Sequence, residues 1–223
     1  MSDKLHKLRD AIDHIDAEIL QLIAKRMTLS DEVIAAKNGE AAFRPGREAA
    51  LIRRLAGMDS SMPPAVLLGI WRQIMAASLS RQNKDLTFAV HQAALPAAIW
   101  HMGSALTARH CDDFDSVLAL LGSSHCRYGL VPATHDDKEL ARAMTAAQNI
   151  YITARTPLFP IPTVTPAYIL ADYLPDKSGD DISLFAVPAA DDGLQIVAVD
   201  GYFDDHIPAS CYPAARLLGI YAR

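Results

Sequence analysis

Two basic residues fall on an otherwise apolar stripe near the start of the chain. From Leu5 to Ala36, apolar residues recur every three or four positions, which is the spacing of one helix face. Arg26 lies on this stripe, and Lys37 follows eleven residues later, about three turns further on nearly the same face. An arginine stays charged and is costly to bury without a partner. The pattern therefore predicts a site for a small polyanion, with a solvated or salt-bridged helix face as the alternative.

Composition limits the classes of protein to consider. The chain has 223 residues, of which 51% are hydrophobic, enough for one large or two modest domains. An amphipathic charged segment follows the first residues, and no run of 18 apolar residues occurs. Three distant cysteines and eight scattered histidines favour reduced thiols and no metal site. We therefore expect a cytoplasmic protein that binds neither a membrane nor nucleic acid.

Charge and proline content change near residue 84. Residues 1–84 hold 13 basic and 10 acidic side chains, a formal charge of +3, whereas residues 85–223 hold 8 and 16, a charge of −8. Ten of the 13 prolines lie in the second part. The contrast predicts two domains, 1–84 and 85–223.

The first part has the pattern of three helices. Helix one, over about residues 4–37, would be roughly 50 Å long, so its stripe needs an equally long partner, most simply the same helix of another chain. Helix two starts near Pro45 and helix three after Pro63-Pro64, as prolines suit a first turn. Ser78 and Gln82 continue the apolar face of helix three and should point inward. A frayed, exposed helix end is the alternative for Gln82.

These helices carry a resemblance. The matching segments, in order, are Leu8-Arg9-x2-Ile12-x2-Ile15-Asp16-x2-Ile19-Leu20-x-Leu22-Ile23-x2-Arg26, Val33-x3-Lys37, Arg44-Pro45-Gly46-Arg47-Glu48 and Trp71-Arg72-Gln73-Ile74-Met75-x2-Ser78-x3-Gln82. Together they resemble the all-helical chorismate mutase family over about residues 4–84. The similarity is greatest to the mutase domain that is fused to prephenate dehydratase.

The resemblance implies an intertwined homodimer that rearranges chorismate to prephenate without a cofactor. By position, the resemblance implies that Arg26 and Arg47 bind the substrate carboxylates, with Arg9 supplied to the same site by the partner subunit. Lys37 and Gln82 would donate hydrogen bonds to the ether oxygen. Glu48 would hold the ring hydroxyl, and Ser78 would line the pocket. In one departure, Arg44 stands where some relatives have an acidic residue, which alters the charge at the pocket edge.

The chemistry and the chain geometry agree with these roles. A concerted rearrangement needs no nucleophile, metal or proton relay, but a held conformer and donors aimed at developing charge. Arginine forks suit carboxylates. Arg9 and Arg26 are 17 residues apart, roughly 25 Å along one helix, so one small ligand can meet both only if Arg9 comes from another chain. A surface salt bridge of Arg9 to Asp13 is the alternative.

The second part alternates predicted strands and helices, which suggests a small α/β layer. The strands are expected at 86–90, 128–132, 149–153, 182–187 and 195–199, and the helices at residues up to 102, 114–121 and 138–148. Tyr128-Gly129-Leu130-Val131-Pro132 and Asp181–Val187 faintly resemble prephenate dehydratase. However, residues 90–94 lack its Gly-rich loop, Thr134-His135-Asp136 replaces its Glu-Asn-Ser, and Ser183-Leu184-Phe185 replaces its Thr-Arg-Phe motif. We interpret this half as a truncated relative without dehydratase chemistry.

The sequence thus predicts a chorismate mutase, an isomerase of the intramolecular transferase type, in the shikimate pathway to phenylalanine and tyrosine. Three alternatives remain. They are an isochorismate-pyruvate lyase, which shares the helical fold and cationic pocket, a bifunctional mutase and dehydratase, and a non-catalytic dimerisation or ligand-sensing module.

Overall fold

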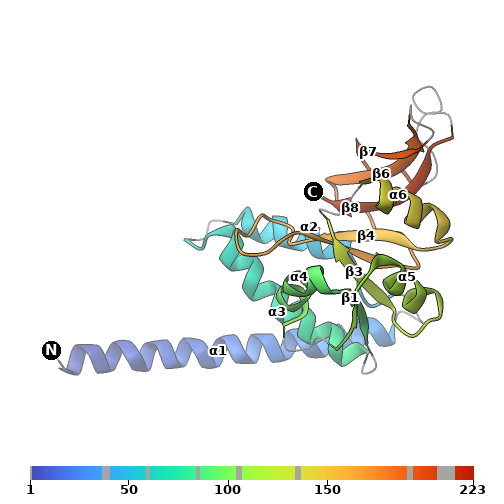
Figure 1. The fold of residues 1–223 in the computed structure, drawn as a ribbon. Helices are drawn as coiled ribbons and strands as arrows, with labels where there is room; N and C mark the ends of the chain where they lie inside the picture. The colour runs from blue at the N-terminus through green and yellow to red at the C-terminus, as the bar shows by residue number, and fades with distance from the viewer. Residues whose placement is uncertain are drawn as a thin grey trace.

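Three helices precede a mixed α/β domain in the computed structural model (Figure 1). The structure describes residues 2–36, 41–58, 61–83, 86–103, 107–133, 137–189, 193–204 and 214–223. The predicted fold class, a helical part followed by an α/β part, is confirmed in this arrangement.

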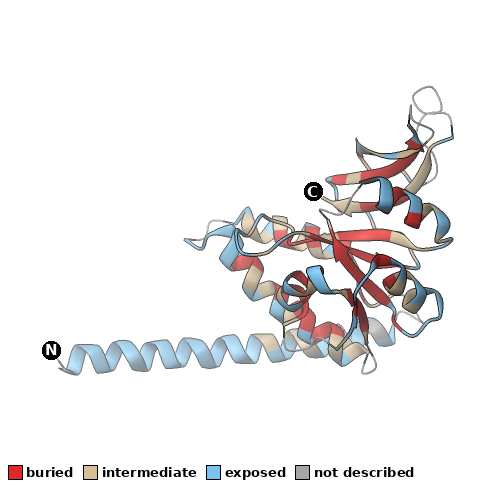
Figure 2. Cartoon of the chain, viewed as in Figure 1, coloured by how far each residue is buried: buried red, intermediate tan, exposed pale blue. Residues whose placement is uncertain are grey.

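The helical part consists of α1 (Ser2–Ala35), α2 (Pro45–Ala56) and α3 (Pro64–Gln82). Both α2 and α3 begin at a proline, whose fixed backbone angle suits the first turn of a helix. The last turns of α1 pack against α3, whereas its N-terminal part projects away from the rest of the chain (Figure 1). Residues 3–22 are exposed throughout (Figure 2). The stripe predicted to be buried is therefore uncovered within one chain.

Eight strands form a single mixed sheet in the order β2-β1-β3-β5-β4-β8-β6-β7. Their bounds are β1 Phe88–His91, β2 Ala108–Cys111, β3 Tyr128–Pro132, β4 Tyr151–Thr156, β5 Ala167–Ala171, β6 Asp181–Pro188, β7 Leu194–Asp200 and β8 Arg216–Ala222. β1 pairs in parallel with β2 and β3, and β4 with β8, whereas the other neighbours are antiparallel. The short helices are η1 (Gln92–Ala94), α4 (Leu95–Met102), α5 (Phe114–Gly122) and α6 (Asp137–Ala146).

The two faces of the sheet are covered by different parts of the chain. Because side chains alternate along a strand, Phe88 and Val90 join one core cluster and Ala89 joins another. The first cluster includes Phe43 and Leu79 of the helical part together with residues of α4. The second contains residues of α5 and α6. One face of the sheet is thus covered by α4 together with residues of the helical part, and the two parts share a hydrophobic core.

Polar contacts add to this junction. The Tyr173 hydroxyl donates to the backbone oxygen of Phe43 at 2.9 Å. Arg53 of α2 donates to Ser178 Oγ at 3.0 Å and to the backbone oxygen of Asp180 at 2.9 Å. The boundary between residues 84 and 85 lies outside the described residues, so it stays a prediction. The shared contacts indicate that the two parts are not loosely linked.

Several elements of the second part differ from the sequence-based expectation. Strands β2, β5 and β8 were not expected as strands, and together with the predicted ones they extend the small layer into an eight-stranded sheet.

Within the described ranges, no helix is long and apolar enough to cross a membrane. The same residues contain no group of three or more side chains suited to hold a metal ion.

Gly46 of α2 lies close against the backbone of the second part, and it gives a test of the junction. A Cβ at Gly46 would lie 1.8 Å from the backbone oxygen of Asp176, whereas a Cβ at Gly69 of α3 would meet nothing within 4 Å. Gly46→Ala should therefore force the two parts to separate locally and cost about 1–3 kcal/mol or more. The matched control Gly69→Ala should gain about 0.5–1 kcal/mol, since alanine is the better helix former.

Thermal melting of both variants with the native protein measures the difference. A melting temperature for Gly46→Ala equal to or above that of the native protein would contradict the close packing of α2 on the α/β domain.

Candidate active site

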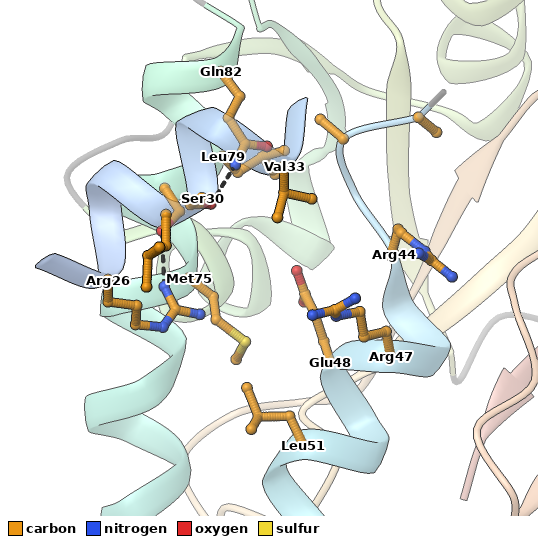
Figure 3. A pocket seen from close by; sticks show the side chains of 14 residues that line it. Arg26, Ser30, Val33, Arg44, Arg47, Glu48, Leu51, Met75, Leu79 and Gln82 are labelled. Carbon is orange, nitrogen blue, oxygen red and sulfur yellow. Dashed lines mark hydrogen bonds between the residues drawn. The ribbon is translucent and has the colours of Figure 1, made fainter. Parts of the chain in front are cut away.

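A cavity of about 310 Å³ lies between the end of α1, α2, α3 and the segment before α2 (Figure 3). Four charged side chains and three polar ones line it, among aliphatic neighbours. They are Arg26, Arg44, Arg47, Glu48, Ser30, Ser78 and Gln82. A cationic cavity of this size, with neutral donors at its edge, suits a small anionic molecule.

Two hydrogen bonds fix the cavity wall where α1 meets α3 (Figure 3). Arg26 donates through Nη1 to Ser78 Oγ at 2.9 Å, and Gln82 donates through Nε2 to Ser30 Oγ at 2.7 Å. Both bonds use side chains on helix faces that were expected to point inward. They hold Arg26 and Gln82 on the cavity side of their helices.

The cations in and around the cavity crowd one another. Burial lowers the pKa of Arg26, Glu48 raises it, and Arg72 and Arg47 lower it further. An arginine remains protonated in spite of such a shift, because its unperturbed pKa is far above neutral. An anionic ligand in the cavity would favour the charged form of Arg26.

Glu48 is held by a buried neighbour. Arg72 of α3 donates through Nη1 to Glu48 Oε2 at 2.5 Å, and the two side chains are 5% and 18% exposed. This ion pair joins α2 to α3. Because Glu48 lines the cavity, the pair also sets where its carboxylate stands.

Arg44 links the cavity edge to the α/β domain. Its Nη2 lies 3.2 Å from Asp176 Oδ2, and both side chains are partly buried. The departure noted in the sequence thus places an extra cation at the edge of the cavity. Asp176, from the second domain, offsets its charge.

The structure brings together most of the residues singled out from the sequence. Arg26, Arg47, Glu48, Ser78 and Gln82 all line the cavity. Lys37 lies outside the described residues. Arg9 is exposed on the projecting part of α1 and does not line the cavity of its own chain. Their roles in binding or catalysis stay predictions.

Sequence reasoning missed two residues. Ser30 lies four residues after Arg26, one turn on, so the helical period that selected Arg26 could have found it. Arg72 stands within one of the matching segments, but no local signal gives it a role, because its partner Glu48 is 24 residues away in the chain. Such a pairing follows from the packing of α2 on α3.

Two of the three dehydratase-like positions of the second part have structural roles. Ser183, where the Thr-Arg-Phe motif was expected, is fully buried. Its hydroxyl donates to the backbone oxygen of Gly201 at 2.8 Å and accepts from the backbone N–H of Phe203 at 3.0 Å. After β1, where a Gly-rich loop was expected, the His91 ring accepts from the Ala93 N–H and caps a short 3₁₀ helix. Thr134-His135-Asp136 lie outside the described residues.

Comparison with known proteins agrees with the helical assignment. Residues 8–83 match the family model described as chorismate mutase type II. The chain is 30% identical over 129 residues to a bifunctional chorismate mutase/prephenate dehydratase of Neisseria gonorrhoeae, covering 56% of this chain and 35% of that protein. It is 33% identical over 87 residues to the T-protein of Enterobacter agglomerans, covering 37% and 23%. The predicted resemblance of the helical part to this family is confirmed.

Similarity of this chain to known proteins extends beyond the helical part. With 84 residues before residue 85, an alignment that covers 56% of the chain must extend beyond the helical part. Prephenate dehydratase from Arthrobacter aurescens is similar in structure at a TM-score of 0.47 and 12% identity, covering 62% of this chain and 90% of that chain. The chain spans about a third or less of the length of the two sequence relatives.

The Glu48–Arg72 pair predicts a large difference between two charge-removing substitutions. Glu48→Gln leaves Arg72 buried without its carboxylate, a loss of about 3–5 kcal/mol in fully buried pairs. We expect the lower end of that range, because Glu48 keeps 18% of its side chain exposed. Asp31→Asn breaks the exposed pair with Arg81 and should cost at most about 1 kcal/mol.

Denaturant unfolding of the two variants beside the native protein gives these free energies. Equal losses for Glu48→Gln and Asp31→Asn would show that the buried pair is not a structural support.

Proposed function

We propose that the helical part of this chain is a chorismate mutase that converts chorismate to prephenate, within phenylalanine and tyrosine biosynthesis. The observation that carries the proposal is the cavity in which Arg26, Arg47, Glu48, Ser78 and Gln82 meet. These five residues come from three separate helices. They are also the residues that the family resemblance assigns to the substrate.

In the proposed reaction, the side chains that line the cavity hold the substrate in its reactive conformation. Chorismate carries two carboxylates, and the guanidinium groups of Arg26 and Arg47 can bind them and hold the reactive conformer. As the C–O bond breaks, the ether oxygen gains charge, and Gln82 can donate to it from its Nε2 without changing protonation. Lys37 is proposed as the second donor, and Glu48 as the partner of the ring hydroxyl.

We further propose that the active unit is a homodimer with shared sites. Apolar side chains on the projecting part of α1 are about half exposed, among them Leu8 at 54%, Ile12 at 56% and Ile15 at 53%. A contiguous apolar stripe of this kind calls for a partner, and a second copy of the same helix has the matching length and pattern. In such a pair, Arg9 would reach the partner's cavity.

An isochorismate-pyruvate lyase would use the same cationic cavity on a different substrate. Supplying chorismate and isochorismate separately, and identifying the products, distinguishes the two enzymes. Ser183 is buried in structural hydrogen bonds, and the turn after β1 is a capped helix start. Both observations support the proposal that the full chain does not act on prephenate. Prephenate consumption by the full chain tests that part of the proposal.

Shared sites predict complementation between inactive proteins. Arg9→Ala and Arg26→Ala homodimers should each lose mutase activity, by about 10²–10³-fold if each donor faces developing or substrate charge. After the two are unfolded, mixed and refolded, heterodimers should contain one intact site and one doubly altered site. Random pairing then restores about a quarter of native activity.

Arg54→Ala serves as the matched control, because Arg54 is exposed on α2 and does not line the cavity. It should retain native activity alone and in mixtures. If the mixture of Arg9→Ala and Arg26→Ala forms dimers but recovers no mutase activity, then Arg9 acts within its own chain or has no part in the site.

Gln82 predicts a pH dependence. The amide of the native protein donates at any pH, whereas a carboxyl in its place must be protonated to donate. Gln82→Glu should therefore be most active in acid and lose activity as its carboxyl ionises, while the native protein stays active through neutral pH. Identical pH–rate profiles for the two proteins would place Gln82 outside the reacting centre.

A further inference from the structure

Arg72 has two polar groups that its ion pair with Glu48 does not use. The residue is 4% exposed, and its Nη1 is taken by Glu48. Its Nε and Nη2 are buried and have no hydrogen-bond partner among the described residues. Buried charged donors without partners are costly, so a native structure rarely leaves them unfilled.

The two free donors have a specific geometry. Nε–H and the neighbouring Nη2–H lie on the same edge of the planar guanidinium. This edge matches the two oxygens of a carboxylate in a bidentate pair. A single spherical anion can meet both donors less well, since it offers one centre to two parallel bonds. The unfilled edge of Arg72 is therefore shaped for a planar oxyanion.

A second cavity, of about 40 Å³, adjoins this arginine at the junction of the two domains. Arg72 of α3, His101 of α4 and Arg155 of β4 line it, with apolar neighbours that include Leu68 and Trp100. A single water needs about 10–15 Å³ of such space. The cavity can thus hold a few waters or one small molecule, and it is too small for a ligand the size of chorismate.

His101 adds a third polar group without a partner. Its Nδ1 lies 2.9 Å from Thr156 Oγ1, whereas its buried Nε2 has no partner within the described chain. Burial, and then the charge of Arg72, lower the pKa of His101 well below its ordinary value, so the ring is neutral near pH 7. When the Thr156 hydroxyl donates to Nδ1, Nε2 carries the hydrogen and becomes a donor.

The charges around the cavity favour a monovalent anion. Arg72 and Arg155 are cationic, and Glu48 is the one carboxylate among its described lining residues. The formal balance of two positive charges and one negative leaves +1. A small carboxylate would neutralise it, fill the free edge of Arg72 and place its carbon end against Leu68 or Trp100.

We infer that this junction cavity is a binding site for a small carboxylate, which adjusts the larger cavity through the Arg72–Glu48 pair. Glu48 lines both cavities, so the pair connects them directly. A carboxylate on the free edge of Arg72 shares its charge and weakens its hold on Glu48. The regulatory half of this inference rests on the proposed mutase function, whereas the binding half does not.

Binding is tested on the full chain with sodium acetate as the probe and sodium chloride at equal ionic strength as the reference. Acetate should raise the melting temperature by about 2–4 °C when present at a severalfold excess over its Kd. The shift should disappear in Arg72→Lys, which keeps the charge but loses the fork, and shrink in His101→Phe. Arg81→Lys, on the same helix but away from the cavity, should respond as the native protein does.

The melting experiments test whether the junction cavity binds a carboxylate, and the mutase assays test whether that binding affects the larger cavity. Equal shifts with chloride and acetate, or none with either, would overturn the carboxylate site, as would a full acetate shift in both Arg72→Lys and His101→Phe. In mutase assays, acetate should raise KM for chorismate in the native protein and less in His101→Phe. An acetate-induced melting shift without a KM change would overturn the coupling but keep the site. A chain with no mutase activity would refute the proposed function, and the melting comparison would still decide the binding.

Discussion

The ion pair between Glu48 and Arg72 is the interaction on which the architecture of the site depends. It joins α2 to α3 at 2.5 Å, with both side chains largely removed from water. Burying a charge is costly unless it is paired, so the two helices are held in one relative position by an electrostatic requirement. In that position Glu48 lines the larger cavity, and Glu48 and Arg72 both line the smaller cavity at the domain junction.

The second domain takes part in the site in the same physical way. Residues of the helical part pack on one face of its sheet. Neither part therefore completes its hydrophobic core without the other. At the cavity edge, Asp176 pairs with Arg44, a cation where some relatives were expected to carry an acid. The second domain therefore stabilises the mutase-like helices and moderates the charge of their cavity. This is a physical use for a domain in which Ser183 and the turn after β1, two of its dehydratase-like positions, have structural roles.

Features that depend on neighbouring residues in the chain could be predicted from the sequence, whereas features that depend on contacts between distant residues could not. The three N-terminal helices and the inward faces carrying Arg26, Ser78 and Gln82 could be predicted, because helical period and proline positions are local signals. Strands β2, β5 and β8 escaped prediction. β2 is short and largely polar, and β8 depends on pairing with strands far away in the chain. The Arg72 partnership and the junction cavity likewise arise from contacts between distant elements. Lys37 lies outside the described residues, so its predicted role rests on sequence alone.

The most direct test of the central claim is the fate of chorismate with the purified full chain. The claim is that the cavity around Arg26 and Glu48 holds chorismate in its reactive conformer. Proton NMR of the reaction, followed in time without added metal or cofactor, identifies the product. The account predicts that chorismate signals are replaced by those of prephenate, far faster than in the uncatalysed sample, and that prephenate then accumulates. Unchanged chorismate in the presence of a folded protein would contradict the account.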